Sequence, residues 1–436
     1  MGWEDIYKAK VVSAEEAVSA INPGDRVFYS LGANAPLDLV NALSRRLPEL
    51  GYLTFITGSA GYPFEYLTNP EYKTFFKHYS FFLVGERESV NQESIEPYPF
   101  HFSGVDELLK NHAKPNVMMC ECAPPDERGY FSYGCFGTYC NHTVEGMVSK
   151  IIIQVNRRTP YVYGRQNVIH VSQVSHIIEQ DHELFDVSTK PSATDVQARI
   201  AHYLVERIED GSTLQIGVGG LANAVSALLE SKKDLGVYSE FFMDSFLDLI
   251  EKGIINGKRK TYHPGEITCS FGPNSRAGWD FVHKNPIAMY YPVSYINNPY
   301  NIAKNDNLVS INNALMVDLT GQVCSESLGF RQYSGTGGQV DFVRGAAMAK
   351  HGQSFITLPS CLSSKENPIS RIVLSLPPGQ TVTTLRTDVD KVATEYGIAE
   401  LRHRSISERV REMIKIAHPQ FRDELRFEAK KAGLLY

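Results

Sequence analysis

The sequence predicts an α/β fold made of two tandem, related open α/β domains. The first observation is a repeated local pattern, in which a short apolar segment is followed by a glycine turn and a helical stretch. Residues 27–29 lead through 31–33 to a helix over 37–43, and residues 213–216 lead through 217–220 to a second helix. Strands that alternate with helices in this way build mainly parallel sheets.

The second observation is a constant offset of 187 residues between the two glycine-turn units. At this offset Gly24 matches Gly211, Gly32 matches Gly219 and Ala35 matches Ala222. Two unrelated uses of a common strand–loop–helix unit are the alternative. We expect two related domains, with the active site between them.

A polar segment near residues 186–194 indicates the domain boundary, because Ser188, Thr189, Pro191 and Ser192 gather there. The predicted domains are therefore 1–187 and 188–436. Directly after this segment, Thr194 and Gln197 have the spacing of a capping box, which predicts the start of a helix. The apolar face of that helix continues to Ile208 with helical spacing.

Further elements follow along the chain. Apolar runs predict buried strands over 149–155, 355–358 and 372–374. Ser405 and Glu408 form a second capping box, and the mixed-charge segment after Pro419 predicts a surface helix.

The composition excludes several classes of protein. Hydrophobic residues make up 43% and charged residues 21% of the chain, which is ordinary for a globular protein. The net charge of −6 disfavours general nucleic-acid binding, and no apolar run reaches the ~18–20 residues that span a bilayer. The acidic start lacks the features of a signal peptide. Seven cysteines fit a reducing compartment. We expect a cytoplasmic protein with no nucleic-acid or membrane partner.

The sharpest local signal is the glycine-rich stretch 215–222, which joins a strand to a helix. Glycines allow close approach to the backbone, and the N–H groups at a helix start favour an anion. Gly217, Gly219 and Ala222 also satisfy the dinucleotide fingerprint GxGxxA. Glu240 ends the next strand, near the position of a ribose-binding acid. A nicotinamide-dependent oxidoreductase is therefore one alternative.

A second glycine-rich stretch, 334–342, suggests another arrangement. Two glycine loops could supply backbone N–H donors around one acid, and such donors stabilise an oxyanion on a carbonyl under attack. A carboxylate is a competent nucleophile toward an activated acyl group. Tight-turn packing is the plain explanation for either loop, and an exposed strand-end acid is the plain explanation for Glu240.

Taken together in order and spacing, these segments resemble the acetyl-CoA hydrolase/CoA-transferase family, in particular its 4-hydroxybutyrate and butyryl-CoA:acetate CoA-transferase branch. The resemblance extends from Gly24 to Pro419. It is carried by Pro124-Pro125-Asp126 with Gly129, Gly217-Val218-Gly219, Ser239-Glu240, Gly335-x-Gly337-Gly338-Gln339-x-Asp341-Phe342 and the stretch from Thr394 to Leu401.

The resemblance implies roles for individual residues. Glu240 is the nucleophile that becomes a glutamyl-CoA thioester. Gly217, Val218, Gly219, Gly220 and Leu221 line the CoA and acyl site, with the N–H groups of Leu221 and Gly338 as oxyanion donors. Leu315 and Lys365 match positions that contact CoA. Asn297 and Glu395 match positions of the carboxylate pocket.

The implied reaction moves CoA between a short-chain acyl-CoA, of butyryl or 4-hydroxybutyryl type, and a carboxylate such as acetate, with ping-pong kinetics. CoA is then a substrate moiety, and no tightly bound cofactor is expected. An acyl-CoA hydrolase that uses the same glutamate is the nearest alternative, and a non-catalytic CoA-binding or assembly protein is another. We expect a homo-oligomer, in the simplest case a dimer.

Two further segments carry expectations. Cys120, Cys122, Cys135 and Cys140 resemble metal-ligand spacing, but we expect reduced structural thiols and no metal. The loops 58–64 and 31–34 contain small and aromatic residues and are predicted to form the wall of the acyl pocket, with ordinary loop packing as the alternative.

Overall fold

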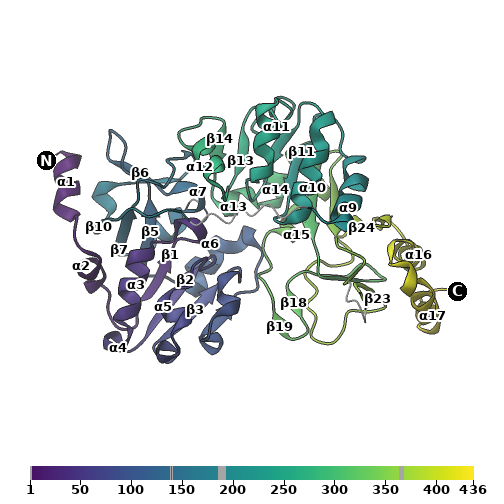
Figure 1. The fold of residues 1–436 in the computed structure, drawn as a ribbon, viewed down its shortest axis with the longest axis horizontal. Helices are drawn as coiled ribbons and strands as arrows, with labels where there is room; N and C mark the ends of the chain where they lie inside the picture. The colour runs from purple at the N-terminus through teal and green to yellow at the C-terminus, as the bar shows by residue number, and fades with distance from the viewer. Residues whose placement is uncertain (1, 138, 140, 185–192, 363–367) are drawn as a thin grey trace. The chain divides into compact units, whose positions relative to one another are not determined.

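A mainly parallel sheet organises each of two units in the computed structural model of the chain (Figure 1). The structure describes residues 2–137, 139, 141–184, 193–362 and 368–436. The first unit comprises residues 1–188 with 268–296, and the second comprises 189–267 with 297–436. The domain limits at 187/188 stay a prediction, and most of the predicted boundary segment lies outside the described residues.

The sheet of the first unit has seven strands in the described residues, and all its neighbouring pairs are parallel. In spatial order these are β10 (His176–Glu179), β7 (Lys150–Val155), β5 (Val117–Cys122), β1 (Arg26–Tyr29), β2 (Leu53–Thr57), β3 (Phe76–Ser80) and β4 (Ile95–Pro97). The order of the strands reverses between β1 and β5, and this is where α/β sheets form ligand crevices.

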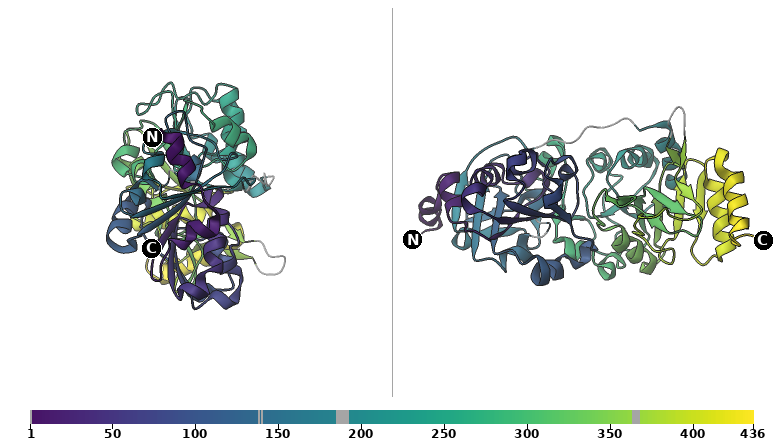
Figure 2. Two further views of the ribbon diagram at one scale, coloured as in Figure 1. Left: turned by 90° about the vertical axis from the view of Figure 1, so that its left-hand side faces the viewer. Right: turned by 90° about the horizontal axis from the view of Figure 1, so that it is seen from below.

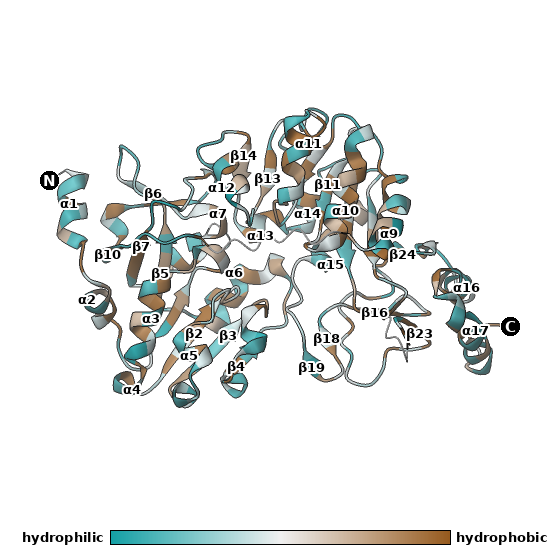
Figure 3. Cartoon of the chain, viewed as in Figure 1, coloured by the Kyte–Doolittle hydropathy of each residue, from teal (hydrophilic) through white to brown (hydrophobic). Residues whose placement is uncertain are grey.

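Both faces of this sheet are buried, as expected for parallel strands covered by crossover helices. Successive side chains of β1 alternate between faces, so Val27 and Tyr29 lie in one apolar cluster and Phe28 lies in the other. Helices α2 (Ala14–Ser19) and α3 (Leu37–Arg45) supply apolar residues to the cluster around Tyr29. Figure 3 shows the brown, hydrophobic colouring concentrated along the central strands.

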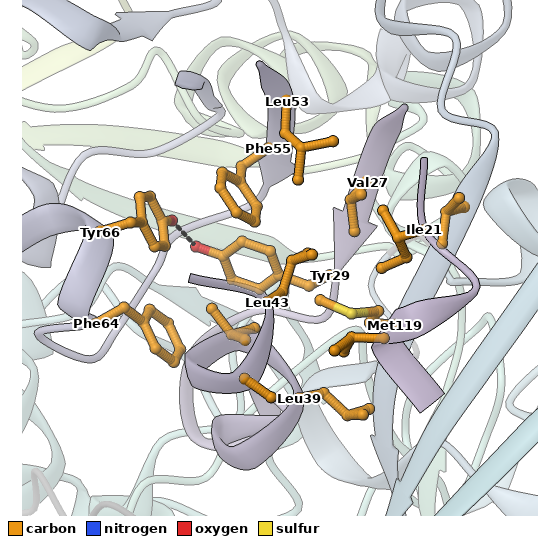
Figure 4. Close-up of a cluster of buried hydrophobic side chains, with 14 of the residues drawn as sticks. Ile21, Val27, Tyr29, Leu39, Leu43, Leu53, Phe55, Phe64, Tyr66 and Met119 are labelled. Carbon is orange, nitrogen blue, oxygen red and sulfur yellow. Dashed lines mark hydrogen bonds between the residues drawn. The ribbon is translucent and has the colours of Figure 1, made fainter. Parts of the chain in front are cut away.

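The cluster around Tyr29 also contains buried polar groups, which pair with one another. The Tyr29 and Tyr66 hydroxyls lie 2.7 Å apart (Figure 4), and the Tyr66 hydroxyl lies 2.8 Å from Nδ1 of His78. The rings of Phe55 and Tyr66 stack with a centroid distance of 4.3 Å. Pairing offsets the cost of burying these hydroxyls, so the aromatic cluster can be dense without leaving them unsatisfied.

The second unit contains a sheet with the spatial order β25 (Gly397–Glu400), β24 (Lys391–Thr394), β20 (Gln353–Thr357), β15 (Leu308–Asn313), β11 (Thr213–Ile216) and β12 (Gly236–Tyr238). The neighbouring pairs from β24 to β12 are parallel, and β25 pairs antiparallel to β24. Helices α9 (Asp195–Val205) and α10 (Gly220–Leu228) pack against each other. The C-terminal helices α16 (Ile406–Ile416) and α17 (Arg422–Lys431) also lie side by side (Figure 2, yellow).

The predicted relationship between the two units is visible in their geometry. β1 and β11 are offset by 187 residues at both ends, and each lies between the next strand of the chain and a later one. The preceding glycines, Gly24 and Gly211, also share a left-handed conformation, with φ of 79° and 81°. The prediction of a tandem α/β fold with parallel sheets is confirmed.

Most of the smaller sequence predictions also hold. Both capping boxes form. The backbone N–H of Gln197 donates to the Thr194 hydroxyl, and the backbone N–H of Glu408 donates to the Ser405 hydroxyl. The predicted strand over 372–374 is shorter than expected. It forms β23 (Ile372–Val373), which pairs with β16 (Met316–Asp318) in a small separate sheet rather than in the central one. No helix among the described residues is both long and apolar enough to cross a membrane.

Candidate active site

Glu240 lies two residues beyond the buried strand β12, at the carboxyl end of the second sheet. The intervening Ser239 is fully buried, whereas Glu240 keeps partial exposure. One carboxylate oxygen, Oε2, accepts a hydrogen bond of 2.7 Å from Nδ2 of Asn297. Asn297 is itself fully buried and directly precedes Asn298, the N-cap of α14 (Pro299–Ile302). The strand end and the helix cap thus fix the two partners in place.

Gly338 brings the second glycine loop against this pair. It directly precedes α15 (Gln339–Met348), with φ of −97°, so its backbone conformation is open to other residues. Space is the constraint. A Cβ atom here would lie 1.9 Å from Nδ2 of Asn297 and 2.1 Å from Oε2 of Glu240. Only glycine leaves room for the carboxylate, so the structure brings together three of the predicted site residues.

The surroundings of Glu240 favour its neutral form. Burial is the main cause and raises the pKa of Glu240 to about 7, against the opposing effect of the hydrogen bond from Asn297. The carboxylate of Asp341, in the first turn of α15, raises the pKa further. A carboxyl group with a pKa near neutrality at a strand end is typical of functional sites. Its ionised form is poorly solvated and therefore reactive.

The first glycine loop follows β11, the strand next to β12. The Gly217 amide donates to the Ile311 carbonyl at 2.8 Å, which holds the loop against the end of β15. Gly219 has φ of 138°, a conformation that favours glycine, and it precedes α10. The loop therefore ends at a helix start, where first-turn N–H groups have no acceptor inside the helix. Gly220 and Leu221 occupy that first turn, and Val218 is exposed.

A buried polar network under this loop was not predicted. Gln215 and Asn312 exchange two amide hydrogen bonds, of 3.2 and 3.1 Å, and the Ser310 hydroxyl donates to Oε1 of Gln215 at 2.5 Å. The neighbouring Asn313 donates to the Val218 carbonyl at 3.2 Å. The only sequence feature that could have indicated this network is the presence of polar residues, such as Gln215 and Asn312, in two otherwise apolar strands. Their pairing depends on the register of β11 against β15.

The remaining predicted residues lie farther along the same edge of the sheet. Leu315 follows β15 and is half-buried. Glu395 follows β24, which stands four strand positions from β12, or about 19 Å at the usual strand spacing. Both oxygens of Glu395 accept hydrogen bonds from Ser360, at 2.9 and 2.6 Å. The structure does not bring Glu395 next to Glu240, and Lys365 lies outside the described residues.

In the first unit, Cys120 and Cys122 are buried reduced thiols with their sulfur atoms 3.7 Å apart, and Cys135 is also buried. Cys140 lies outside the described residues. The part of the chain that the structure describes contains no group of three ligands able to hold a metal.

The two predicted wall loops of the acyl pocket do contact each other. The Gly32 amide donates to the Ser59 carbonyl at 3.3 Å, and a Cβ on Gly61 would lie 3.0 Å from Cα of Gly32. Their role in acyl binding stays a prediction.

Comparison with known proteins places this geometry in context. Residues 1–187 match the acetyl-CoA hydrolase/transferase N-terminal domain, and residues 275–429 match the C-terminal domain of the same name. The 4-hydroxybutyrate coenzyme A transferase of Clostridium kluyveri is 41% identical over 99% of this chain and 100% of its own length. The butyryl-CoA:acetate CoA-transferase of Anaerostipes caccae is 34% identical over 100% and 99%.

Among solved structures, RipA from Yersinia pestis superposes with a TM-score of 0.92 at 33% identity, with full coverage of both chains. The family resemblance read from the sequence is thereby confirmed. The chain belongs to the acetyl-CoA hydrolase/transferase family.

Proposed function

We propose that this protein is an acyl-CoA:carboxylate CoA-transferase that uses Glu240 as a covalent nucleophile. The donor is a short-chain acyl-CoA of butyryl or 4-hydroxybutyryl type, and the acceptor is a carboxylate such as acetate. The family assignment supports CoA chemistry, and full-length relatives at 34–41% identity carry transferase names. CoA enters as part of the substrate. Family membership also favours CoA chemistry over the nicotinamide alternative.

One observation carries the proposal. The Glu240 carboxylate is held by Asn297 in a space that only a glycine at position 338 leaves open. An exposed strand-end acid would need neither a buried amide partner nor a glycine pressed against its oxygen. A side chain placed in this way is aimed and partly desolvated, as a nucleophile toward a thioester must be.

The proposed reaction begins with the ionised Glu240. One carboxylate oxygen attacks the thioester carbonyl, the C–S bond breaks and CoA thiolate leaves, so that a mixed anhydride forms. The thiolate then attacks the Glu240 carbonyl of this anhydride. The anhydride C–O bond on the Glu240 side breaks, the first acid departs as a carboxylate, and a glutamyl-CoA thioester remains.

The second half reverses these steps with a new carboxylate. It attacks the Glu240 thioester carbonyl and releases CoA thiolate. The thiolate then attacks the new acyl carbonyl, which yields the new acyl-CoA and frees Glu240. Thioester and carboxylate are exchanged with no net proton, water or electron. Each half can occur without the other substrate, so ping-pong kinetics are expected.

The two glycine loops supply the electrostatic part of the proposal. Each tetrahedral intermediate carries negative charge on the former carbonyl oxygen, which backbone N–H donors stabilise. We assign this role to the N–H groups of Leu221, in the first turn of α10, and Gly338, before α15. Gly217, Val218, Gly219 and Gly220 would line the path of the CoA thiol end, and Asn297 would also face the incoming carboxylate.

A carboxylate-exchange assay tests this function. Butyryl-CoA is incubated with ¹⁴C-acetate, and labelled acetyl-CoA is measured together with free thiol. We expect labelled acetyl-CoA to form with butyrate and little free thiol. Free thiol that accumulates at the same rate with and without acetate would instead identify a hydrolase, the other activity in the family name. No turnover of either kind would contradict both.

A further inference from the structure

Arg371 is placed at the carboxyl end of β15 by contacts on both sides of its backbone. It lies between β22 (Ile369–Ser370) and β23, where its amide donates to the Ser360 carbonyl and its carbonyl accepts from Val317, each at 2.9 Å. Its side chain turns back to Leu315, and Nε donates to the Leu315 carbonyl at 2.8 Å. The guanidinium is thus held with one nitrogen fixed and its terminal nitrogens left for another partner.

This guanidinium makes no direct ion pair within the part of the chain that the structure describes, although the Glu395 carboxylate is near enough to act on it electrostatically. Arg371 forms no ion pair there, although burial is sufficient to lower its pKa. The nearby Glu395 uses both of its oxygens on Ser360. A partly desolvated charge with no directly bonded counter-ion is costly, and a guanidinium binds phosphate or carboxylate in a two-pronged geometry. The arrangement therefore suits an anion that is not part of the protein.

The position of Arg371 along the sheet edge indicates which anion this is. Leu315 follows β15 and Ser360 follows β20, which stand two and three strand positions from β12 and Glu240. At the usual strand spacing this separates Arg371 from Glu240 by about 10–15 Å. At this distance Arg371 is too far from Glu240 to contact a substrate carboxylate that reacts there. The pantetheine arm of CoA separates the thiol from its phosphates by a distance of this kind.

We propose that Arg371 binds the phosphate-bearing end of the CoA moiety, while Glu240 receives its thiol end. This inference rests on the proposed function and adds a residue to its substrate site. A substrate carboxylate is the other anion that a guanidinium could take, and the experiment below separates the two sources.

The test compares two thioesters that share the butyryl group and the pantetheine arm, of which only butyryl-CoA carries the 3′-phospho-ADP group with its phosphates. The values of kcat/KM for butyryl-CoA and butyryl-pantetheine are measured with saturating acetate for the wild type, Arg371→Gln and Arg371→Lys. For Arg371→Gln we expect kcat/KM for butyryl-CoA to fall about 10- to 100-fold, with little change for butyryl-pantetheine. Arg371→Lys keeps the positive charge but loses the two-pronged guanidinium, so its kcat/KM for butyryl-CoA should lie between those of the wild type and Arg371→Gln. The ratio of the two values does not depend on the amount of folded enzyme.

A matched control is Arg344→Gln, because Arg344 pairs with Asp388 at 3.0 Å and lies on the exposed side of α15. This variant should keep the wild-type ratio. Equal losses of kcat/KM for both thioesters in Arg371→Gln would overturn the proposal. A raised KM for acetate in Arg371→Gln, measured with butyryl-pantetheine, would also overturn it and would assign Arg371 to binding of the carboxylate. If the wild type transferred no CoA, the proposed function would fail. The role of Arg371 would then be tested by itself, by calorimetric comparison of the affinities of the wild type and Arg371→Gln for CoA and for pantetheine.

Discussion

Nδ2 of Asn297 lies 2.7 Å from Oε2 of Glu240, and Asn297 is fully buried with its Oδ1 atom unpaired within the described residues. The amide therefore serves the carboxylate rather than a packing network of its own. Because it donates to the charged form, it holds the pKa of Glu240 below the value that burial would otherwise impose.

Replacing Asn297 should shift the pH dependence of the reaction. In Asn297→Ala the pKa of Glu240 rises, so the acid limb of the kcat/KM profile moves to higher pH, and activity at pH 7 falls about 10-fold. Asn305→Ala is the matched control, since Asn305 is equally buried and its Oδ1 also has no partner among the residues that the structure describes. It should lose stability without moving the profile. An unchanged acid limb in Asn297→Ala would contradict the role of the amide.

Adding one methyl group at position 338 should strongly reduce activity. The Cβ of Gly338→Ala would overlap Asn297 and Glu240, and displacing the proposed nucleophile by even an ångström is expected to lower kcat by about 100-fold or more. Gly104→Ala is the control, because Gly104 has φ of −93° and open space around its missing Cβ. Steady-state kinetics of both variants measure the difference. Near-normal kcat in Gly338→Ala would show that the close contact is not needed.

The raised pKa of Glu240 also predicts a dependence of stability on pH. A carboxyl group whose pKa rises from 4.5 to about 7 on folding destabilises the native state as pH increases through that range, by up to about 3 kcal/mol. Glu240→Gln keeps the hydrogen bond from Asn297 and removes the charge. Its thermal midpoint should therefore exceed that of the wild type at pH 8 and match it at pH 4.5. The exposed Glu251→Gln should show no such pattern.

A pair of charged groups in the first unit predicts a further loss of stability at higher pH. Nε2 of His182 lies 2.5 Å from Oε2 of the fully buried Glu121. Burial alone would lower the pKa of His182, but the contact with Glu121 raises it to about 9. The contribution of the pair to the free energy of unfolding is fully present below pH 6.5 and is lost as pH rises through 9.

Denaturant titrations at pH 6.5 and 10 measure this contribution. Wild-type stability should fall by up to about 3 kcal/mol between these values, and His182→Gln should lose most of that dependence. His202→Gln, at an exposed ion pair with Glu206, is the control. Equal pH dependence in the wild type and His182→Gln would rule out the raised pKa.

Local patterns predicted the elements but not the contacts between them. The strand over 213–216, both capping boxes and the offset of 187 residues follow from apolar periodicity, cap residues and glycine turns, all of which act over a few neighbouring residues. Glu240 was singled out because it ends the strand that follows a glycine loop, but its role as nucleophile was implied only by the family resemblance. The Gln215–Asn312 pair and the turn of Arg371 toward Leu315 depend on strand order and register, which no local pattern encodes.

The most direct measurement is mass spectrometry of the protein incubated with butyryl-CoA and then treated with borohydride, which reduces a glutamyl thioester to an alcohol. The account predicts this modification on the peptide that contains Glu240 in the wild type, its loss when excess acetate discharges the intermediate before reduction, and its absence in Glu240→Gln. An active wild-type enzyme with Glu240 unmodified under these conditions would contradict the covalent mechanism.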